Sequence, residues 1–82
     1  MQYRLVFTKR ALKDLKAIEK PDRKRILDRI DLLQDDLGGD VKRLTNRTPE
    51  YRMRCGNWRV LFEIVNSELI IYRIRHRREV YQ

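Results

Sequence analysis

The sequence is poor in the residues from which most metal, redox and nucleophilic sites are built. Its 82 residues include one cysteine, one histidine, three glycines and two prolines. A lone Cys55 cannot form an internal disulfide, which fits a reducing compartment. One histidine, with no acidic cluster at ligand spacing, argues against a metal site. The Gly38-Gly39 pair does not match a phosphate-binding loop, and Ser67, the only serine, has no base near it in sequence. We therefore expect neither a metal nor a cofactor.

Long apolar runs are also absent. No stretch of about 18 apolar residues occurs, so the sequence predicts no membrane span. Residues 1–4 lack the apolar core of a signal peptide. With 41% hydrophobic and 39% charged residues, a chain of this length predicts one globular domain over residues 1–82. We expect a soluble, cytoplasmic protein.

Positive charge is what the sequence has in excess. Lysine and arginine number 20 against 12 acidic residues, a net charge of +8. Residues 1–41 carry ten basic and eight acidic side chains (+2), whereas residues 42–82 carry ten basic and four acidic ones (+6). Nine of the ten later cations are arginines, the side chain suited to bidentate phosphate contact. Charge alone supports two interpretations about equally: an anionic partner, nucleic acid first, or a face that merely keeps the protein soluble or binds an acidic protein.

Apolar periodicity predicts one strand and two helices in the first half. Alternating apolar residues predict the strand over residues 2–7. Thr8 is placed to cap the first helix, which Lys20-Pro21-Asp22 ends, and Pro21 suits the first turn of the second. Gly38-Gly39 is the expected stop of the second helix. The apolar faces of the two helices are Ala11, Leu12, Leu15 and Ile18 in the first, and Ile26, Ile30, Leu33 and Leu37, with Leu27 beside them, in the second.

Period-two alternation predicts three strands in the second half, joined by the turns Gly56-Asn57 and Asn66-Ser67. The expected apolar faces are Tyr51, Met53 and Cys55; Trp58, Val60, Phe62 and Ile64; and Ile70, Tyr72 and Ile74. The resulting order, β-α-α-β-β-β, predicts an α+β fold. In it, two antiparallel helices pack on one face of a largely antiparallel sheet.

The arginines of these strands are the leading candidates for a functional site. Arg52, Arg54 and Arg59 share one side of the sheet if the first hairpin pairs directly. Like-charged neighbours repel one another, which favours a bound phosphate; the alternative is a solvated outer face. His76 is the only side chain with an unperturbed pKa near neutrality, so it is the candidate acid or base, with a structural role as its alternative. Cys55 falls on an apolar face and is expected to be a buried structural thiol.

Two segments of the sequence resemble a known family. Residues 51–64, YRMRCGNWRVLFEI, and residues 76–81, HRREVY, are similar to the toxins of the RelE/ParE superfamily of bacterial toxin–antitoxin systems. The similarity extends through essentially the whole chain, including Lys42-Arg43-Leu44. It implies the RelE-like fold and one of two activities. RelE toxins cleave mRNA in the ribosomal A site without a metal, whereas ParE toxins inhibit DNA gyrase.

The resemblance also implies an active site. The positions that match it are Arg52, Arg54, Arg59, Arg77 (with Arg78 as its alternative) and Tyr81. The tyrosine favours RelE over ParE. Family members often carry lysine at one or both of positions 52 and 54, and arginine cannot release a proton as a lysine can. The general base therefore stays open between His76 and the ribosomal RNA. Further RNA contacts are expected from Lys42, Arg43, Arg47, Arg73, Arg75 and Arg78.

In the implied chemistry, Arg59 and Arg77 stabilise the negative charge of the transition state. Arg52 and Arg54 hold the RNA backbone, and Tyr81 stacks on a nucleotide. The implied partners are a cognate RelB-like antitoxin that wraps the helices and the basic face, the ribosome with its mRNA, and operator DNA indirectly through the antitoxin complex. The alternatives are a gyrase inhibitor and a nucleic-acid-binding module without catalytic activity.

Overall fold

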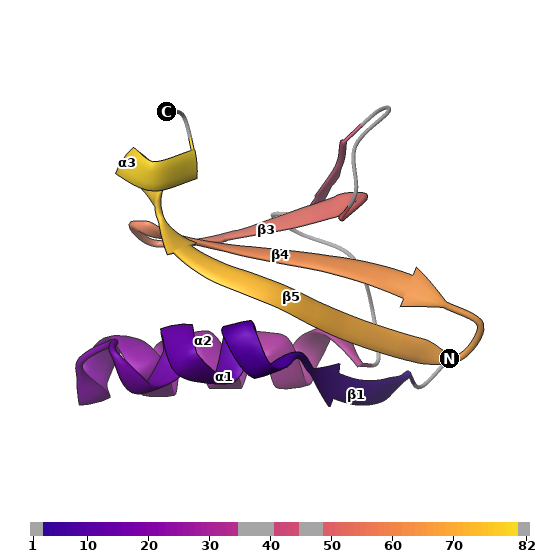
Figure 1. The fold of residues 1–82 in the computed structure, drawn as a ribbon, viewed down its shortest axis with the longest axis horizontal. Helices are drawn as coiled ribbons and strands as arrows, with labels where there is room; N and C mark the ends of the chain where they lie inside the picture. Colours follow the sequence, from indigo (N-terminus) through magenta and orange to yellow (C-terminus); the bar gives the residue numbers. More distant parts are fainter. Residues whose placement is uncertain (1–2, 35–40, 45–48, 81–82) are drawn as a thin grey trace.

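The computed structural model describes residues 3–34, 41–44 and 49–80. Within these residues, two helices cover one face of a five-stranded sheet, and a short third helix lies on the opposite side (Figure 1). The elements are β1 (Arg4–Phe7), α1 (Lys9–Lys16), α2 (Lys20–Leu33), β2 (Val41–Arg43), β3 (Tyr51–Cys55), β4 (Trp58–Val65), β5 (Glu68–His76) and α3 (Arg77–Val80). The predicted α+β class, with both N-terminal helices on one face, is confirmed.

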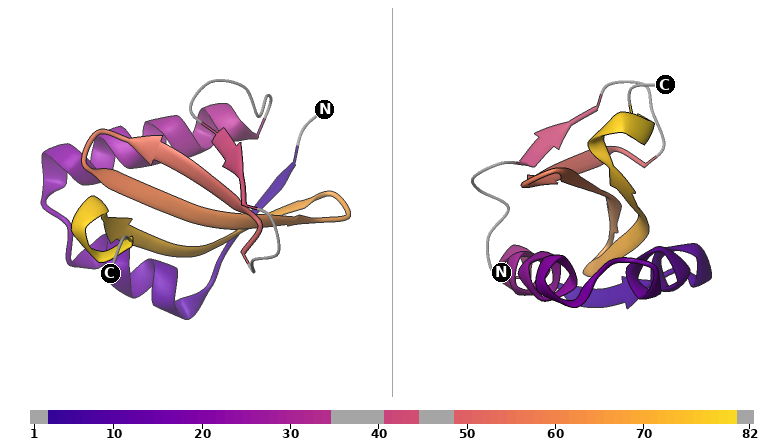
Figure 2. Two further views of the ribbon diagram at one scale, coloured as in Figure 1. Left: turned by 90° about the horizontal axis from the view of Figure 1, so that it is seen from above. Right: turned by 90° about the vertical axis from the view of Figure 1, so that its left-hand side faces the viewer.

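The strand order is β1-β5-β4-β3-β2. Strands β2 to β5 pair antiparallel in sequence order, whereas β1 pairs parallel with β5. Two elements were missing from the predicted order: β2, a short strand on the far edge of the sheet, and α3. Both are too short to show a period in the sequence. The sheet is strongly curved, and its β5 end bends over α1 (Figure 2).

The two long helices begin where local chemistry predicts. Thr8 caps α1, because its side-chain oxygen accepts a hydrogen bond from the Ala11 N–H at 3.1 Å. Pro21 lies in the first turn of α2, where its missing N–H is no loss. The break between the helices was predicted too late: α1 ends at Lys16, and Lys20 already belongs to α2. Leu12 was wrongly expected on the apolar face of α1, since it is 45% exposed.

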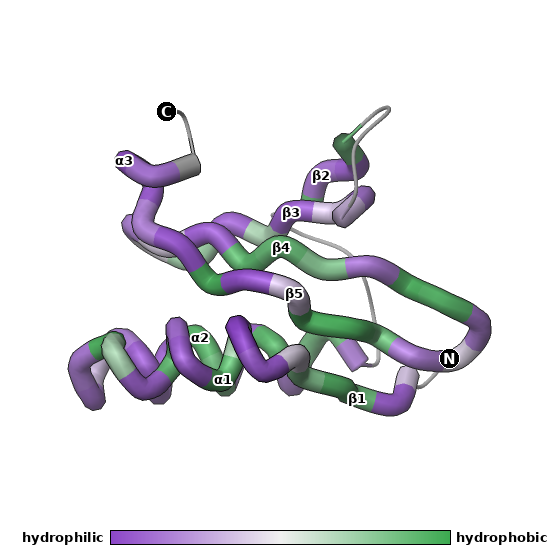
Figure 3. Tube along the Cα trace, viewed as in Figure 1, coloured by the Kyte–Doolittle hydropathy of each residue, from purple (hydrophilic) through white to green (hydrophobic). Residues whose placement is uncertain are grey.

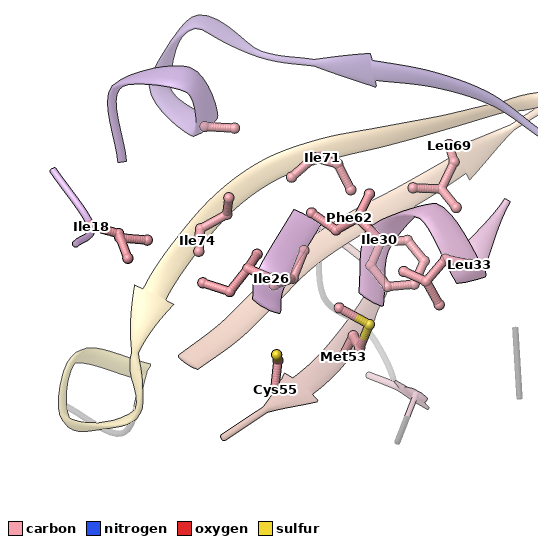
Figure 4. Close-up of a cluster of buried hydrophobic side chains, with 12 residues drawn as sticks. Ile18, Ile26, Ile30, Leu33, Met53, Cys55, Phe62, Leu69, Ile71 and Ile74 are labelled. Carbon is pink, nitrogen blue, oxygen red and sulfur yellow. The ribbon is translucent and has the colours of Figure 1, made fainter. Parts of the chain in front are cut away.

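The core lies between the helix layer and the sheet (Figure 4). It is formed by Ala11, Ile18, Ile26, Ile30, Leu33, Met53, Cys55, Val60, Phe62, Leu69, Ile71 and Ile74. The stripe of Ile26, Ile30 and Leu33 faces the sheet as predicted, and the thiol of Cys55 is buried. The predicted continuation of the second helix to Leu37, and its stop at Gly38-Gly39, lie outside the described residues.

The face of β5 was predicted wrongly over its first half. Leu69 and Ile71 are fully buried, and so is Ile74, which means that the buried positions change from odd to even numbers along the strand. The cause is a break in register against β4. Leu61 pairs with Arg73, but Phe62 pairs with Ile71, so that Tyr72 has no partner in β4. One extra residue of this kind is a β-bulge, and it reverses the faces of every residue beyond it.

Candidate nucleic-acid interface

A row of arginines crosses the sheet on the face turned away from α1 and α2. Arg59 in β4 is directly opposite Arg54 in β3 and Arg75 in β5, and Lys42 in β2 is opposite Arg52 in β3. Residues directly opposite each other share a face of the sheet. Residues that alternate with them, such as Met53, Val60 and Ile74, face the helices and are buried in the core. We call Lys42, Arg52, Arg54, Arg59 and Arg75 the basic face.

Arg59 is held in place on the basic face by the backbone of the turn beside it. The residue is only 7% exposed, and its Nη1 donates to the carbonyl oxygens of Gly56, at 2.9 Å, and Trp58, at 3.0 Å. These two bonds hold the guanidinium over the turn that joins β3 to β4. A cation held by the backbone before any ligand arrives needs little reorganisation when negative charge develops beside it.

The same turn also holds the start of α3. The backbone N–H of Arg77 donates to the carbonyl oxygen of Asn57 at 2.8 Å. The side chains of Arg77 and Arg78 are exposed, and Arg75 pairs with Glu79 at 3.2 Å. Figure 3 shows the hydrophobic stretch of β5 giving way to hydrophilic residues toward α3. The turn Gly56-Asn57 therefore brings together Arg59 from β4 and the first residue of α3.

The helix side of this turn contains a small cleft of about 120 Å³, lined by Asp22, Arg25, Ile26, Cys55, Gly56, Asn57 and Trp58. Trp58 Nε1 donates to Asp22 Oδ2 at 3.2 Å, which ties the turn to α2. The cleft is smaller than the roughly 300 Å³ that ligand pockets usually reach. The open basic face is therefore the better candidate for binding a polymer such as RNA.

Several predicted site residues do not join the basic face. His76 is opposite Trp58 on the helix side of the sheet, with the two rings edge to face at 5.3 Å, and its Nδ1 accepts from the Arg78 N–H at 3.3 Å. Arg43 is opposite Tyr51 on that same side and lies 3.8 Å from Glu50. Arg73 turns over the sheet edge to Asp14. Arg47 and Tyr81 lie outside the described residues.

Asp14 is the residue that sequence reasoning missed. Its carboxylate accepts from Arg73 Nε at 2.8 Å, from Arg73 Nη2 at 3.2 Å, and from the Ile74 N–H at 3.0 Å. Partial burial by itself raises the pKa of Asp14, but the hydrogen bonds from Arg73 and Ile74 and the nearby arginine charges outweigh it, so the pKa lies below its ordinary value. The signal in the sequence was faint: Asp14 is the single acid in α1, among four cations.

In the described part of the chain, none of the helices is both long and apolar enough to cross a bilayer. In the same residues, no group of three or more histidine, cysteine or acidic side chains comes together as metal ligands would.

Known proteins match this chain over nearly its whole length. Residues 5–81 match the family model described as the ParE toxin of type II toxin–antitoxin system, parDE. Toxin RelE3 of Methanocaldococcus jannaschii is 34% identical over 83 residues, which cover 95% of this chain and 94% of that protein.

Two solved complexes contain chains of the same fold. One is the RelB–RelE antitoxin–toxin complex from Methanococcus jannaschii, with a TM-score of 0.78 and 32% identity over 93% of this chain and 94% of that one. The other is the RelE–RelB complex from Pyrococcus horikoshii OT3, with a TM-score of 0.80 and 26% identity over 94% and 97% of the two chains.

The fold and these matches define a class, the toxins of type II toxin–antitoxin systems. Within that class, the chain belongs to the RelE/ParE superfamily and is RelE-like, which confirms the resemblance seen in residues 51–64 and 76–81.

Proposed function

We propose that this toxin is an endoribonuclease that cleaves mRNA in the A site of the ribosome and so stops translation. The observation that carries the proposal is the basic face, with Arg59 fixed over the turn where α3 begins. Its side chains project from neighbouring strands, so they can contact successive phosphates of one RNA strand. The similarity to RelE3 supports the same activity.

In the proposed reaction, the 2′-oxygen of a nucleotide attacks the adjacent phosphorus. The new P–O2′ bond forms as the P–O5′ bond breaks, leaving a 2′,3′-cyclic phosphate on one fragment and a 5′-hydroxyl on the other. The 2′-hydroxyl loses its proton to a base, and the departing 5′-oxygen gains one. Arg59 and Arg77 stabilise the extra negative charge at phosphorus, while Arg52 and Arg54 hold the backbone. Tyr81 stacks on a nucleotide, a role that rests on the family resemblance alone.

The group that accepts the proton of the 2′-hydroxyl has two candidates, His76 and the ribosomal RNA. His76 lies on the helix side of the sheet, and its Nδ1 is already bonded to the Arg78 N–H. This arrangement favours a base supplied by the ribosome, which would also align the 2′-hydroxyl for in-line attack. If His76 were the base, His76→Gln would lower the cleavage rate on ribosomes.

We also propose that a RelB-like antitoxin neutralises this toxin. The two similar RelE chains were each solved with RelB. An antitoxin segment with acidic residues opposite the basic face would compete with RNA for the same arginines. In such a complex, the antitoxin would make most of the contact with operator DNA.

The direct test is to incubate the purified protein with translating ribosomes and map the mRNA 5′ ends. We expect new 5′-hydroxyl ends within the A-site codon. Arg77→Ala should lower their rate of formation about 100-fold. The fold should survive, because this side chain is exposed. Arg4→Ala is the matched control, since Arg4 is an exposed arginine in β1. Intact mRNA with the wild-type protein would refute the proposal.

The second candidate function is inhibition of DNA gyrase. The specific observation in its favour is the match to a family model of ParE toxins. A supercoiling assay separates the two candidates: loss of supercoiling, with mRNA left intact on ribosomes, would favour the ParE activity.

A further inference from the structure

The β-bulge at Tyr72 decides which face of the sheet receives the last arginines of β5. Before the bulge, the odd-numbered Leu69 and Ile71 face the helices; beyond it, the even-numbered Ile74 does. Arg75 therefore lies opposite Arg59 on the basic face. If the strand instead alternated regularly through Tyr72, Arg75 would have the parity of Leu69 and Ile71 and would face the helices. The position of Arg75 on the basic face thus depends on the bulge at Tyr72 and on the contacts that stabilise it.

Thr8 and α1 make hydrogen bonds to the backbone on both sides of the bulge. Strand β1 pairs with β5 only as far as Ile71, so among the described residues no strand pairs with this edge of β5 beyond that point. Thr8 Oγ1 donates to the carbonyl oxygen of Tyr72 at 2.9 Å, and Asp14 accepts the N–H of Ile74 at 3.0 Å. Thr8, the N-cap of α1, thus supplies a hydroxyl and Asp14 in α1 a carboxylate to the backbone of β5 beyond the end of its pairing with β1.

Asp14 accepts hydrogen bonds from the side chain of Arg73 as well as from the backbone N–H of Ile74. By register, Arg73 starts on the same face as Arg75, but its guanidinium turns over the sheet edge to make a bidentate pair with Asp14. Asp14 and Arg73 are only 18% and 25% exposed in their side chains, so the pair is well shielded from solvent. A bidentate contact fixes orientation as well as distance. Asp14 therefore fixes the last half of β5 relative to α1.

We propose that Asp14 is a positioning residue for the RNA cleavage inferred above, on which this proposal rests. The carboxylate holds the bulged end of β5 so that Arg75 stays in line with Arg59 and so that α3 starts on the Gly56-Asn57 turn. Asp14 does not touch the RNA. Its effect reaches the reaction through the position of Arg75 and Arg77.

The experiment compares Asp14→Asn with Glu68→Gln in the full chain. Both variants remove one acid that contacts an arginine, but Glu68 lies at the opposite end of β5, beside Arg4 at 3.8 Å. Cleavage on mRNA-programmed ribosomes is measured in single turnover, and affinity is measured separately by ribosome binding. Because misplacement by about 1 Å can cost on the order of 100-fold in rate, we expect Asp14→Asn to lower the cleavage rate at least about tenfold. Affinity should change less than about threefold, and Glu68→Gln should alter neither.

Two further measurements separate positioning from general loss of stability. Ile30→Val shortens a fully buried core side chain that does not line the cleft at the Gly56-Asn57 turn, and so lowers stability without removing a contact of Thr8 or Asp14. Its cleavage rate should stay near that of the wild type at a temperature where both proteins are folded. Amide hydrogen exchange at Arg77, whose N–H bonds to Asn57, should speed up in Asp14→Asn by about tenfold or more, while exchange at Phe62 in the core stays unchanged. Arg73→Lys should show the same effects more weakly, because lysine cannot make the bidentate pair.

The outcomes are distinct. If the wild-type protein leaves mRNA intact, the proposed function is wrong. The amide exchange at Arg77 then tests only whether Asp14 positions the start of α3. A wild-type protein that cleaves, together with an Asp14→Asn variant that cleaves equally fast, overturns the positioning role. Unchanged exchange at Arg77 in Asp14→Asn overturns it as well, whatever the substrate.

Discussion

The two hairpin turns at the ends of β4 have the same length and nearly the same φ at their first residue, yet they make different contacts. Gly56 and Asn66 each occupy the first turn position, with φ of 58° and 56°. The carbonyls of Gly56-Asn57 accept from Arg59 and from the first residue of α3. The carbonyl of Ser67 in the other turn accepts from the Arg4 N–H and so starts the pairing of β1. The Gly56-Asn57 turn therefore contacts a residue of the basic face and the start of α3, whereas the Asn66-Ser67 turn contacts β1.

This contrast shows that local backbone geometry does not reveal function. Both turns follow the rule for two-residue hairpins, in which the first residue takes a left-handed conformation that glycine and asparagine tolerate. The first turn differs in its two hydrogen-bond partners. They are the guanidinium of Arg59, which comes from β4, and the backbone N–H of Arg77, which follows β5. The comparison can be tested by changing the two turns in parallel.

The largest expected effect comes from removing the cation at the first turn. Arg59→Ala should lower the rate of mRNA cleavage on ribosomes by about 100-fold or more, as the loss of a transition-state donor does elsewhere. Because Arg59 is buried, a thermal melt must show that the variant is folded. Arg59→Lys is the second variant. It keeps the positive charge but loses the planar guanidinium with its several donors, so its cleavage rate should lie between those of the wild type and Arg59→Ala. A wild-type rate in folded Arg59→Ala would show that the turn has no catalytic role.

A smaller effect is expected from substituting the first residue of each turn with alanine. The positive φ costs an alanine about 1 kcal/mol of folding free energy, and the space is open, since a Cβ at Gly56 would lie 3.9 Å from Arg25 Nη1. Gly56→Ala should therefore destabilise the protein by about that amount and also slow cleavage, because the Gly56 carbonyl holds Arg59. Asn66→Ala should lower stability, measured by urea unfolding, and leave cleavage unchanged. Equal cleavage by the two variants would remove the functional difference between the turns.

The smallest effect concerns the Asp14–Arg73 and Arg4–Glu68 ion pairs at acid pH. The pKa of Asp14 is lowered in the folded protein by its arginine contacts, which outweigh the effect of burial. The stabilisation is therefore present above the unfolded pKa of about 3.9 and is lost as the pH falls through the folded value. Asp14→Asn should remove this part of the acid sensitivity, less than about 1 kcal/mol, from unfolding free energies measured between pH 7 and 3. Glu68→Gln, at the exposed pair, should change it less.

Much of the fold followed from residue patterns because the patterns were long. The stripe Ile26, Ile30, Leu33 and the alternation in β3 and β4 each repeat over several residues, so helix, strands and buried face were predicted correctly. The first half of β5 was not, because the bulge that reverses its faces is held by contacts from Thr8 and Asp14, more than 50 residues away. β2 and α3 were missed because three or four residues carry no period.

The candidate site was predicted less completely than the fold. Direct pairing of the first hairpin was enough to predict that Arg52, Arg54 and Arg59 share one side of the sheet. The register of β3 and β4 confirms this prediction. Arg73 and His76 could not be placed from the sequence, since the first is drawn away by Asp14 and the second follows the face that the bulge sets. The catalytic roles of Arg59, Arg77 and Tyr81 remain predictions that the cleavage assays test.

The pairing of β1 with β5 has a consequence for how the chain reaches its folded state. β1 is the first strand to be synthesised, and its only partner in the described sheet, β5, is the last. The contact closes a loop of more than 60 residues, which slows folding relative to local hairpins. A nascent chain with β5 still unsynthesised lacks both the partner of β1 and the strand that carries Arg75. The basic face is thus assembled only after β5 has been synthesised and has paired with β4.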